Sequence, residues 1–96
     1  MKKDDQHAIS MISYYKVERS IDLNRQQYQK KQYGLYLYQD IIITATHRFQ
    51  LEHVTDISYR PLSTTGLLYL HTNQGVYPYE ICSDPEHFIQ EYQKLK

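Results

Sequence analysis

The chain has 96 residues, 41% of them apolar and 23% charged, and its eleven basic residues balance eleven acidic ones. This length suits one folding unit, and the composition is that of a folded chain rather than a disordered one. The zero net charge argues against nucleic acid as the partner, because a nucleic-acid-binding domain of this size carries a basic excess.

Eleven tyrosines, no tryptophan and one cysteine distinguish the composition. Tyrosine suits a half-buried sheet and is enriched at interfaces, so the tyrosines either fill and cover the sheet or line a binding face. Cys82 alone cannot form an intrachain disulfide, which favours a reducing compartment. The sequence has neither a long apolar run nor a signal-peptide pattern, so we expect a cytoplasmic protein.

The N-terminal third contains one clear element and one ambiguous one. Residues 1–6 are polar, and we expect them to be flexible. Apolar and polar residues alternate from His7 to Val17, which predicts a first strand. Residues 19–32 fit three structures: a helix capped by Ser20 and ended by Gly34, a long polar loop, or an early start of the second strand.

The rest of the chain up to residue 81 has the pattern of short strands joined by tight turns. Ile41, Ile42 and Ile43 are strongly β-prone and do not alternate with polar residues, which indicates burial on both faces. Val54 and Ile57 are the expected core anchors of a later strand. The predicted strands span 35–38, 41–46 with a short continuation at 48–51, 53–59, 67–72 and 76–81.

Turn residues separate these strands. Gln39-Asp40 has the two-residue spacing of a hairpin, and Asn73-Gln74-Gly75 places a glycine where a positive φ is needed. Arg60-Pro61 ends the strand before it. Pro78 lies inside a predicted strand and cannot donate a ladder hydrogen bond, so that strand is expected at an edge or to carry a bulge.

A helix closes the chain, predicted over 84–96. Ser83 or Asp84 can cap it and Pro85 suits its first turn. An apolar stripe then follows at helical spacing: Phe88, Ile89, Tyr92 and Leu95. The fold class is therefore mainly β (α+β), an antiparallel bent sheet or barrel of about six or seven strands with one C-terminal helix. Residues 7–96 form a single domain.

The segment Tyr33–Lys96 resembles a small bacterial pleckstrin-homology-like (PH-like) domain. That resemblance implies a curved antiparallel barrel capped by a helix, which serves as a binding platform for lipids, peptides or other proteins. Fold alone does not establish function. The resembling stretches are Leu35–Ile43, Leu51–Ile57 with its apolar, two polar, apolar spacing, Asn73-Gln74-Gly75, and Asp84–Ile89.

Lipid-binding members of that family use basic residues between the first two strands. The comparable positions here are Arg25, Lys30 and Lys31, and their spacing does not reproduce the pattern of phosphoinositide binders. Binding of an anionic membrane or a phospholipid headgroup through these residues is therefore the alternative function.

No residues form a recognisable catalytic or metal motif. His47 and His53 with Asp56 lack the converging spacing of a zinc site. Cys82 precedes the helix, where a thiol can become reactive, but its base and oxyanion donors are not evident. A small thiol- or metal-dependent enzyme is thus the least favoured function, and we expect a non-enzymatic protein without cofactors.

The favoured function is the binding of a protein or peptide at an exposed sheet edge or through a tyrosine-rich face. The predicted interaction face consists of Tyr36, Tyr38, Tyr77 and Tyr79, with Pro78 marking the edge. The same edge could pair with its own copy, so a homodimer is an open alternative.

Overall fold

The alternating, β-prone segments form seven strands of one open antiparallel sheet, followed by one helix, as the fold class predicted. The computed structural model describes residues 7–22 and 25–96, and the side chains of these residues except 19–22 and 25–27. The strands are β1 (Ser10–Asp22), β2 (Arg25–Leu37), β3 (Ile41–Ile43), β4 (Arg48–Gln50), β5 (Val54–Pro61), β6 (Gly66–Thr72) and β7 (Gly75–Ile81).

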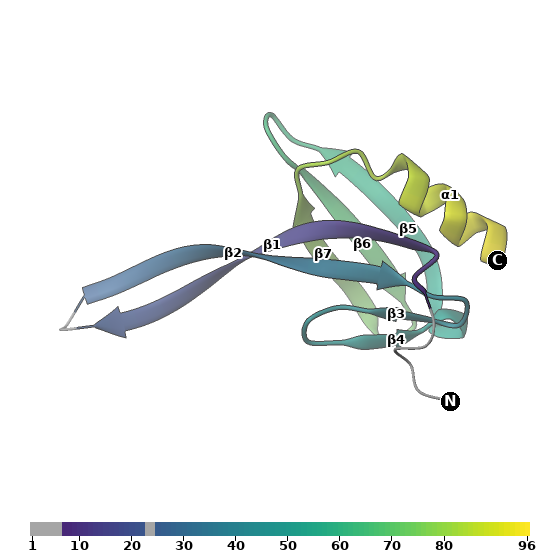
Figure 1. Ribbon diagram of the computed structural model, residues 1–96, viewed down its shortest axis with the longest axis horizontal. Helices are drawn as coiled ribbons and strands as arrows, with labels where there is room; N and C mark the ends of the chain where they lie inside the picture. The colour runs from purple at the N-terminus through teal and green to yellow at the C-terminus, as the bar shows by residue number, and fades with distance from the viewer. Residues whose placement is uncertain (1–6, 23–24) are drawn as a thin grey trace.

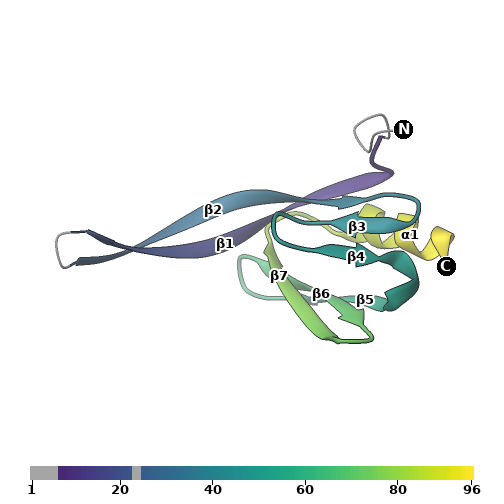
Figure 2. The ribbon, with the colours of Figure 1, turned by 90° about the horizontal axis from the view of Figure 1, so that it is seen from below.

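The sheet has the strand order β4-β3-β2-β1-β7-β6-β5. β1 and β2 form a ribbon of two 13-residue strands that projects from the body, with the other strands gathered at one end (Figure 1). Turned by 90°, the projecting half of the ribbon still has no neighbour (Figure 2). Outside the ribbon, β1 pairs with β7 only through Tyr15 and Glu80, and β2 pairs with β3 only through Tyr36 and Leu37.

The β1–β2 ribbon shows which of the three predicted structures the segment 19–32 adopts. The helix and the long loop are both wrong, because the described residues of this segment lie in β1 and β2, and Gly34 pairs with Ser13 inside the ribbon instead of ending a helix. The first strand begins later and runs further than predicted, from Ser10 to Asp22. A sparse apolar stripe gives a helix little surface to bury, whereas in the ribbon the described residues of β1 and β2 pair their inward-facing backbone groups with each other. The predicted flexible residues 1–6 lie outside the described part of the chain.

The predicted hairpins are confirmed, with one change. Gln39-Asp40 connects β2 to β3, and the Tyr38 amide donates to the Ile41 carbonyl at 2.8 Å. The strand predicted over 41–46 ends at Ile43, however, and residues 48–50 pair back antiparallel on β3 instead of continuing it. The reason is the turn at residues 44–47, which Thr44 organises. A 3₁₀ turn, Leu51–His53, then leads to β5.

Pro78 is only partly explained by an edge position. β7 lies between β1 and β6, so it is not an edge strand of the sheet. Its pairing with β1 is confined to Glu80, which leaves the first part of β7 with a local free edge on the side of β1. Gly75 begins β7 with a φ of 135°, as the turn required.

The helix α1 (Glu86–Leu95) carries the predicted stripe. The N-cap is Pro85, one residue later than predicted, and it makes no side-chain cap bond; the Asp84 side chain before it still accepts the Glu86 amide of the first turn at 3.0 Å. Phe88 and Tyr92 are buried, and the Tyr92 hydroxyl donates to the Val54 carbonyl at 3.1 Å. No helix in residues 7–22 and 25–96 is long and apolar enough to cross a bilayer. The most fully buried side chains are Leu35, Leu37, Ile42, Val54, Leu68, Leu70, Ile81 and Phe88.

Candidate functional site

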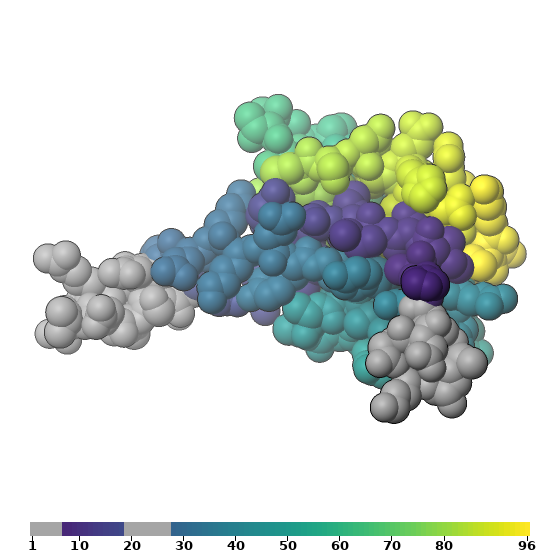
Figure 3. Space-filling view, viewed as in Figure 1, coloured from purple at the N-terminus to yellow at the C-terminus, as the bar shows by residue number. Residues whose placement is uncertain are grey.

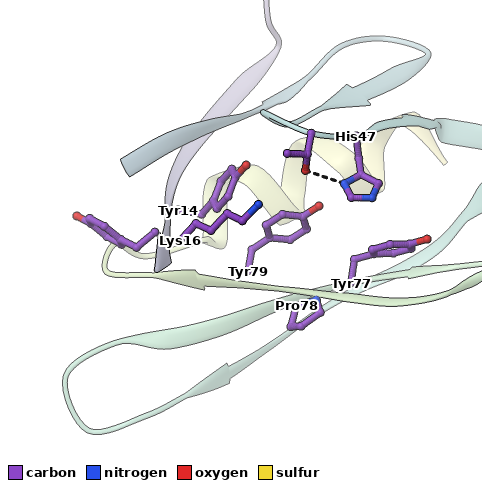
Figure 4. Close-up of a pocket in the computed structure, with 8 residues that line it drawn as sticks. Tyr14, Lys16, His47, Tyr77, Pro78 and Tyr79 are labelled. Atoms are coloured by element: carbon purple, nitrogen blue, oxygen red, sulfur yellow. Dashed lines mark hydrogen bonds between the residues drawn. The ribbon is translucent and has the colours of Figure 1, made fainter. Parts of the chain in front are cut away.

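An aromatic cleft opens where β1 and β7 separate, and the β3–β4 turn forms its third wall. Its volume is about 220 Å³. Figure 4 shows the side chains of Tyr14, Lys16, Tyr79, Tyr77 and His47 around this space. The lining residues are Tyr14, Tyr15, Lys16, Thr46, His47, Tyr77, Pro78 and Tyr79.

The wall from the β3–β4 turn is shaped by one buried side chain. The Thr44 hydroxyl oxygen accepts the amides of Thr46 and His47 at 3.3 and 3.0 Å, and the Thr44 amide donates to the His47 carbonyl at 2.9 Å. The Ala45 amide donates to the Tyr14 hydroxyl at 3.1 Å. These bonds satisfy backbone groups that the short strands leave free, and they hold Thr46 and His47 against the cleft.

Two tyrosines form the floor of the cleft. The rings of Tyr14 and Tyr79 meet edge to face with centroids 4.8 Å apart, a favourable aromatic geometry. Both side chains are buried. Burial raises the pKa of Tyr79 to about 12, and a hydrogen bond with Thr44 partly opposes this rise. Tyr79 is therefore neutral at ordinary pH.

His47 and Tyr77 form a ridge between this cleft and a second depression. The His47 ring stacks on Phe49 at 5.4 Å and lies 5.2 Å from the Tyr77 ring. The His47 Nδ1 and the Thr46 hydroxyl are 2.8 Å apart, the dashed line in Figure 4. The second depression has a volume of about 250 Å³ and also touches His53 and Asn73. The two depressions adjoin across this ridge, and we call the pair the β7 groove.

The free part of β7 offers backbone groups beside this groove. Thr72 and Gly75 are the paired residues that flank the hairpin turn. Because hydrogen-bonded and non-hydrogen-bonded pairs alternate along an antiparallel ladder from this pair onward, the backbone N–H and C=O groups of Tyr77 and Tyr79 point toward β6. Those of Val76 and Pro78 point away from β6. Pro78 therefore removes no hydrogen bond from the β6–β7 ladder, and the Val76 amide and both carbonyls remain available to a further strand.

The structure divides the predicted tyrosine face. Tyr77 and Tyr79 share the inward face of β7 with buried Ile81 and line the β7 groove. Tyr36 lies on the opposite face of its strand from buried Leu35 and Leu37, and Tyr38 is half-buried beside the β2–β3 turn. Adjacent strand residues point to opposite faces, so Tyr36, between buried Leu35 and Leu37, faces outward while Tyr77 and Tyr79 face inward. The four tyrosines therefore do not form one surface.

The same alternation separates the predicted basic patch. The Lys30 ammonium lies 3.3 Å from Glu80, and the Lys31 ammonium lies 3.2 Å from Glu18 on the other face of the ribbon. The Tyr33 hydroxyl and then Lys31 lower the pKa of Glu18. The Arg25 side chain lies outside the described residues. Lys30 and Lys31 thus form no shared cationic surface.

The residues considered for chemistry are dispersed. Among the described residues, no three His, Cys, Asp or Glu side chains are grouped as metal ligands. His47 and His53 both line the second depression, whereas Asp56 belongs to β5. Cys82 is exposed, and its hydrogen bond with Tyr15 raises the pKa of that phenol.

A larger depression of about 540 Å³ lies near the C-terminal end of α1. It is lined mainly by polar side chains that include Gln39, Gln50 and Glu52, and the Lys96 ammonium there donates to the Leu51 carbonyl at 3.1 Å. It lacks the aromatic walls of the β7 groove, so we place the candidate site in the groove.

Sequence reasoning placed only Tyr77, Pro78 and Tyr79 at the aromatic cleft and missed its other lining residues: Tyr14, Tyr15, Lys16, Thr46 and His47. Tyr14 and Lys16 carry no local signal, because only the separation of β1 from β7 exposes them to a common space. The chain matches no protein family, and no curated protein matches it.

Proposed function

We propose that this protein is a non-catalytic binding module that takes an extended peptide or protein segment in the β7 groove. One observation carries the proposal: an incompletely paired strand edge lies beside two adjoining depressions that share a His47–Tyr77 ridge. Peptides that add a strand gain affinity from main-chain hydrogen bonds and specificity from pockets for alternate side chains.

The size of the depressions favours a peptide over a small metabolite. Each measures about 220–250 Å³, whereas sites for drug-sized ligands enclose roughly 300–1,000 Å³. Each depression suits one or two side chains. Tyrosine walls suit apolar and aromatic side chains, and exposed Lys16 supplies one positive charge at the end of the groove. A ligand with an apolar residue followed by a carboxylate would match both features.

Two expectations from the sequence agree with this proposal. The resemblance to PH-like domains implies a binding platform, and the single exposed cysteine suits a cytoplasmic setting. Headgroup binding through Arg25, Lys30 and Lys31 is less favoured, because Lys30 and Lys31 point to opposite faces and each has a carboxylate partner.

The test is selection of ligands from a phage-displayed library of random peptides on the immobilised protein, followed by titration of the enriched peptides. We expect His47→Ala, Tyr77→Ser and Lys16→Glu each to weaken binding about tenfold, a loss of about 1.4 kcal/mol. The control is Leu62→Ala, an exposed apolar residue in the β5–β6 loop.

Far-UV circular dichroism must show that each variant is folded. In nuclear magnetic resonance spectra of isotope-labelled protein, the resonances of β7 and of residues 44–47 should shift when the peptide is added. Failure to enrich any peptide, or equal affinity of the groove variants and wild type, would refute the proposal. If the protein bound vesicles of anionic lipid and no peptide, phospholipid-headgroup binding would be favoured instead.

A further inference from the structure

The walls of the β7 groove carry basic side chains and no described carboxylate. Lys16 lines the aromatic cleft, and Arg48 and His53 line the second depression. No described Asp or Glu lines either depression, although the whole chain has as many acidic as basic residues. The depression near α1 differs, because Asp40 and Glu52 are among its walls. The groove is therefore a local positive region on a chain of zero net charge.

The charges of Lys16 and Arg48 are available to a ligand. Within the described part of the chain, neither side chain takes part in an ion pair. The next acidic residue along β1, Glu18, is bonded to the Tyr33 hydroxyl and to the Lys31 ammonium. Lys16 and Arg48 are both exposed, so a carboxylate from another molecule can approach either of them.

The His47–Tyr77 ridge separates these two cations. Lys16 belongs to β1 and lines only the aromatic cleft, whereas Arg48 begins β4 and lines only the second depression. Figure 4 shows the Lys16 side chain directed toward Tyr79. In space-filling view the β3–β4 hairpin, teal, lies against the β1–β2 ribbon, purple to blue (Figure 3). An occupant of the groove thus meets one cation, then aromatic rings, then the other cation.

β4 adds a second free strand edge beside the groove. It is the last strand of the sheet, and the hydrogen bond from the Thr44 amide to the His47 carbonyl closes its hairpin with β3. Because pairs alternate from there along an antiparallel ladder, the backbone N–H and C=O groups of Arg48 and Gln50 point away from β3. Both residues line the second depression. A segment in the groove therefore meets outward-pointing backbone groups of β4 in addition to those of β7.

We propose that the segment bound in the β7 groove is acidic: an extended stretch of protein in which carboxylate side chains flank an apolar or aromatic residue. This inference rests on the proposed function and narrows the class of its ligand. The central residue packs on His47 and Tyr77, and the flanking carboxylates lie near Lys16 and Arg48. Hydrogen bonds between charged partners are stronger than neutral ones, and opposite charge speeds the encounter of the segment with the groove.

The form of the groove favours an acidic protein segment over an anionic membrane or a nucleic acid. A membrane is held by several basic side chains that act together on one accessible face, whereas this groove offers two cations separated by an aromatic ridge. A nucleic-acid-binding domain carries a basic excess, and this chain has none. An extended polypeptide can use the cations, the aromatic walls and the free strand edges at once.

Three matched sets of short synthetic peptides test the proposal on the full chain. Each set has a central residue that is varied among leucine, isoleucine, valine, phenylalanine and tyrosine. The flanking residues are all glutamate in one set, all glutamine in the second and all lysine in the third. We expect the glutamate set to bind at least about tenfold more tightly than the glutamine set, and the lysine set to bind least. Added salt should weaken the glutamate set and leave the glutamine set nearly unchanged, because salt screens exposed charges.

Two variants connect the preference to the groove. Lys16→Gln and Arg48→Gln should each weaken binding of the glutamate set about threefold, as for an exposed ion pair, and leave the glutamine set unchanged. The control is Arg60→Gln, at an exposed arginine of β5 that lines neither depression, and it should bind both sets like wild type.

The outcomes separate this inference from the proposed function. If the glutamate and glutamine sets bound equally and both shifted the resonances of β7, the acidic preference would be overturned and peptide binding in the groove would stand. Binding of none of the three sets would overturn both. Equal weakening by Arg60→Gln, or binding of anionic vesicles or DNA in place of the glutamate set, would also overturn the acidic preference.

Discussion

The hydrogen bond between Ala45 and Tyr14 is the most direct test of how the groove is built. Tyr14→Phe removes only the phenolic oxygen, which accepts the Ala45 amide at 3.1 Å, and keeps the ring that meets Tyr79 at 4.8 Å. The turn then loses the hydrogen bond that ties Ala45 to β1. Its own bonds through Thr44 remain.

The expected cost follows from the setting of this bond. An amide left without its acceptor costs about 1–3 kcal/mol, and the lower end applies because the Ala45 amide is only partly buried. A loss of about 1 kcal/mol lowers the midpoint of thermal unfolding by about 4–8 °C in a domain of this size. Hydrogen exchange should show faster exchange of the Ala45 amide and unchanged protection of the core strands β6 and β7.

Thermal and urea unfolding followed by circular dichroism measures the first effect, and exchange monitored by nuclear magnetic resonance measures the second. The control is Tyr59→Phe, where the ring lies 39% exposed and a change below about 0.5 kcal/mol is expected. Unchanged stability together with an equally protected Ala45 amide in Tyr14→Phe would refute the account of the turn.

Three further predictions test the core, the turn before β7 and the pH response. Phe88→Ala should lower the free energy of urea unfolding by about 3–5 kcal/mol, because the Phe88 side chain is only 2% exposed. The control is Gln90→Ala, at an exposed position of the same helix. A loss below about 1 kcal/mol in Phe88→Ala would contradict the packing of α1. Gly75→Ala should lower the free energy of unfolding by about 1–2 kcal/mol, because alanine is strained at this positive φ. The strain is the whole effect, since an added Cβ meets no atom within 4 Å. Equal stability of the variant and wild type would argue against this turn. Burial raises the pKa of Tyr79 to about 12 from 10.0, so its contribution should be fully present below pH 10 and lost as pH rises toward 12. Phenol absorbance titration checks the pKa, and ionisation of Tyr79 near its ordinary pKa of 10.0 would refute it.

The sequence by itself determined the elements whose signals are local. The Gln39-Asp40 and Asn73-Gln74-Gly75 turns, Val54 and Ile57 as core anchors, and the apolar stripe of the closing helix all lie where their residue types predict. Turn chemistry and periodicity act over a few residues, so they can be recognised without the rest of the fold.

The tertiary structure decided which face each side chain serves and which strands lie together. Tyr77 and Tyr36 have equivalent local patterns, yet one lines a groove and the other lies on the outer face of the ribbon. Strand pairing between distant segments separates β1 from β7, brings Tyr14 beside Ala45, and leaves the β1–β2 ribbon extending beyond the body. A shift of one residue in register would exchange the two faces, and that register is set by packing across the whole sheet.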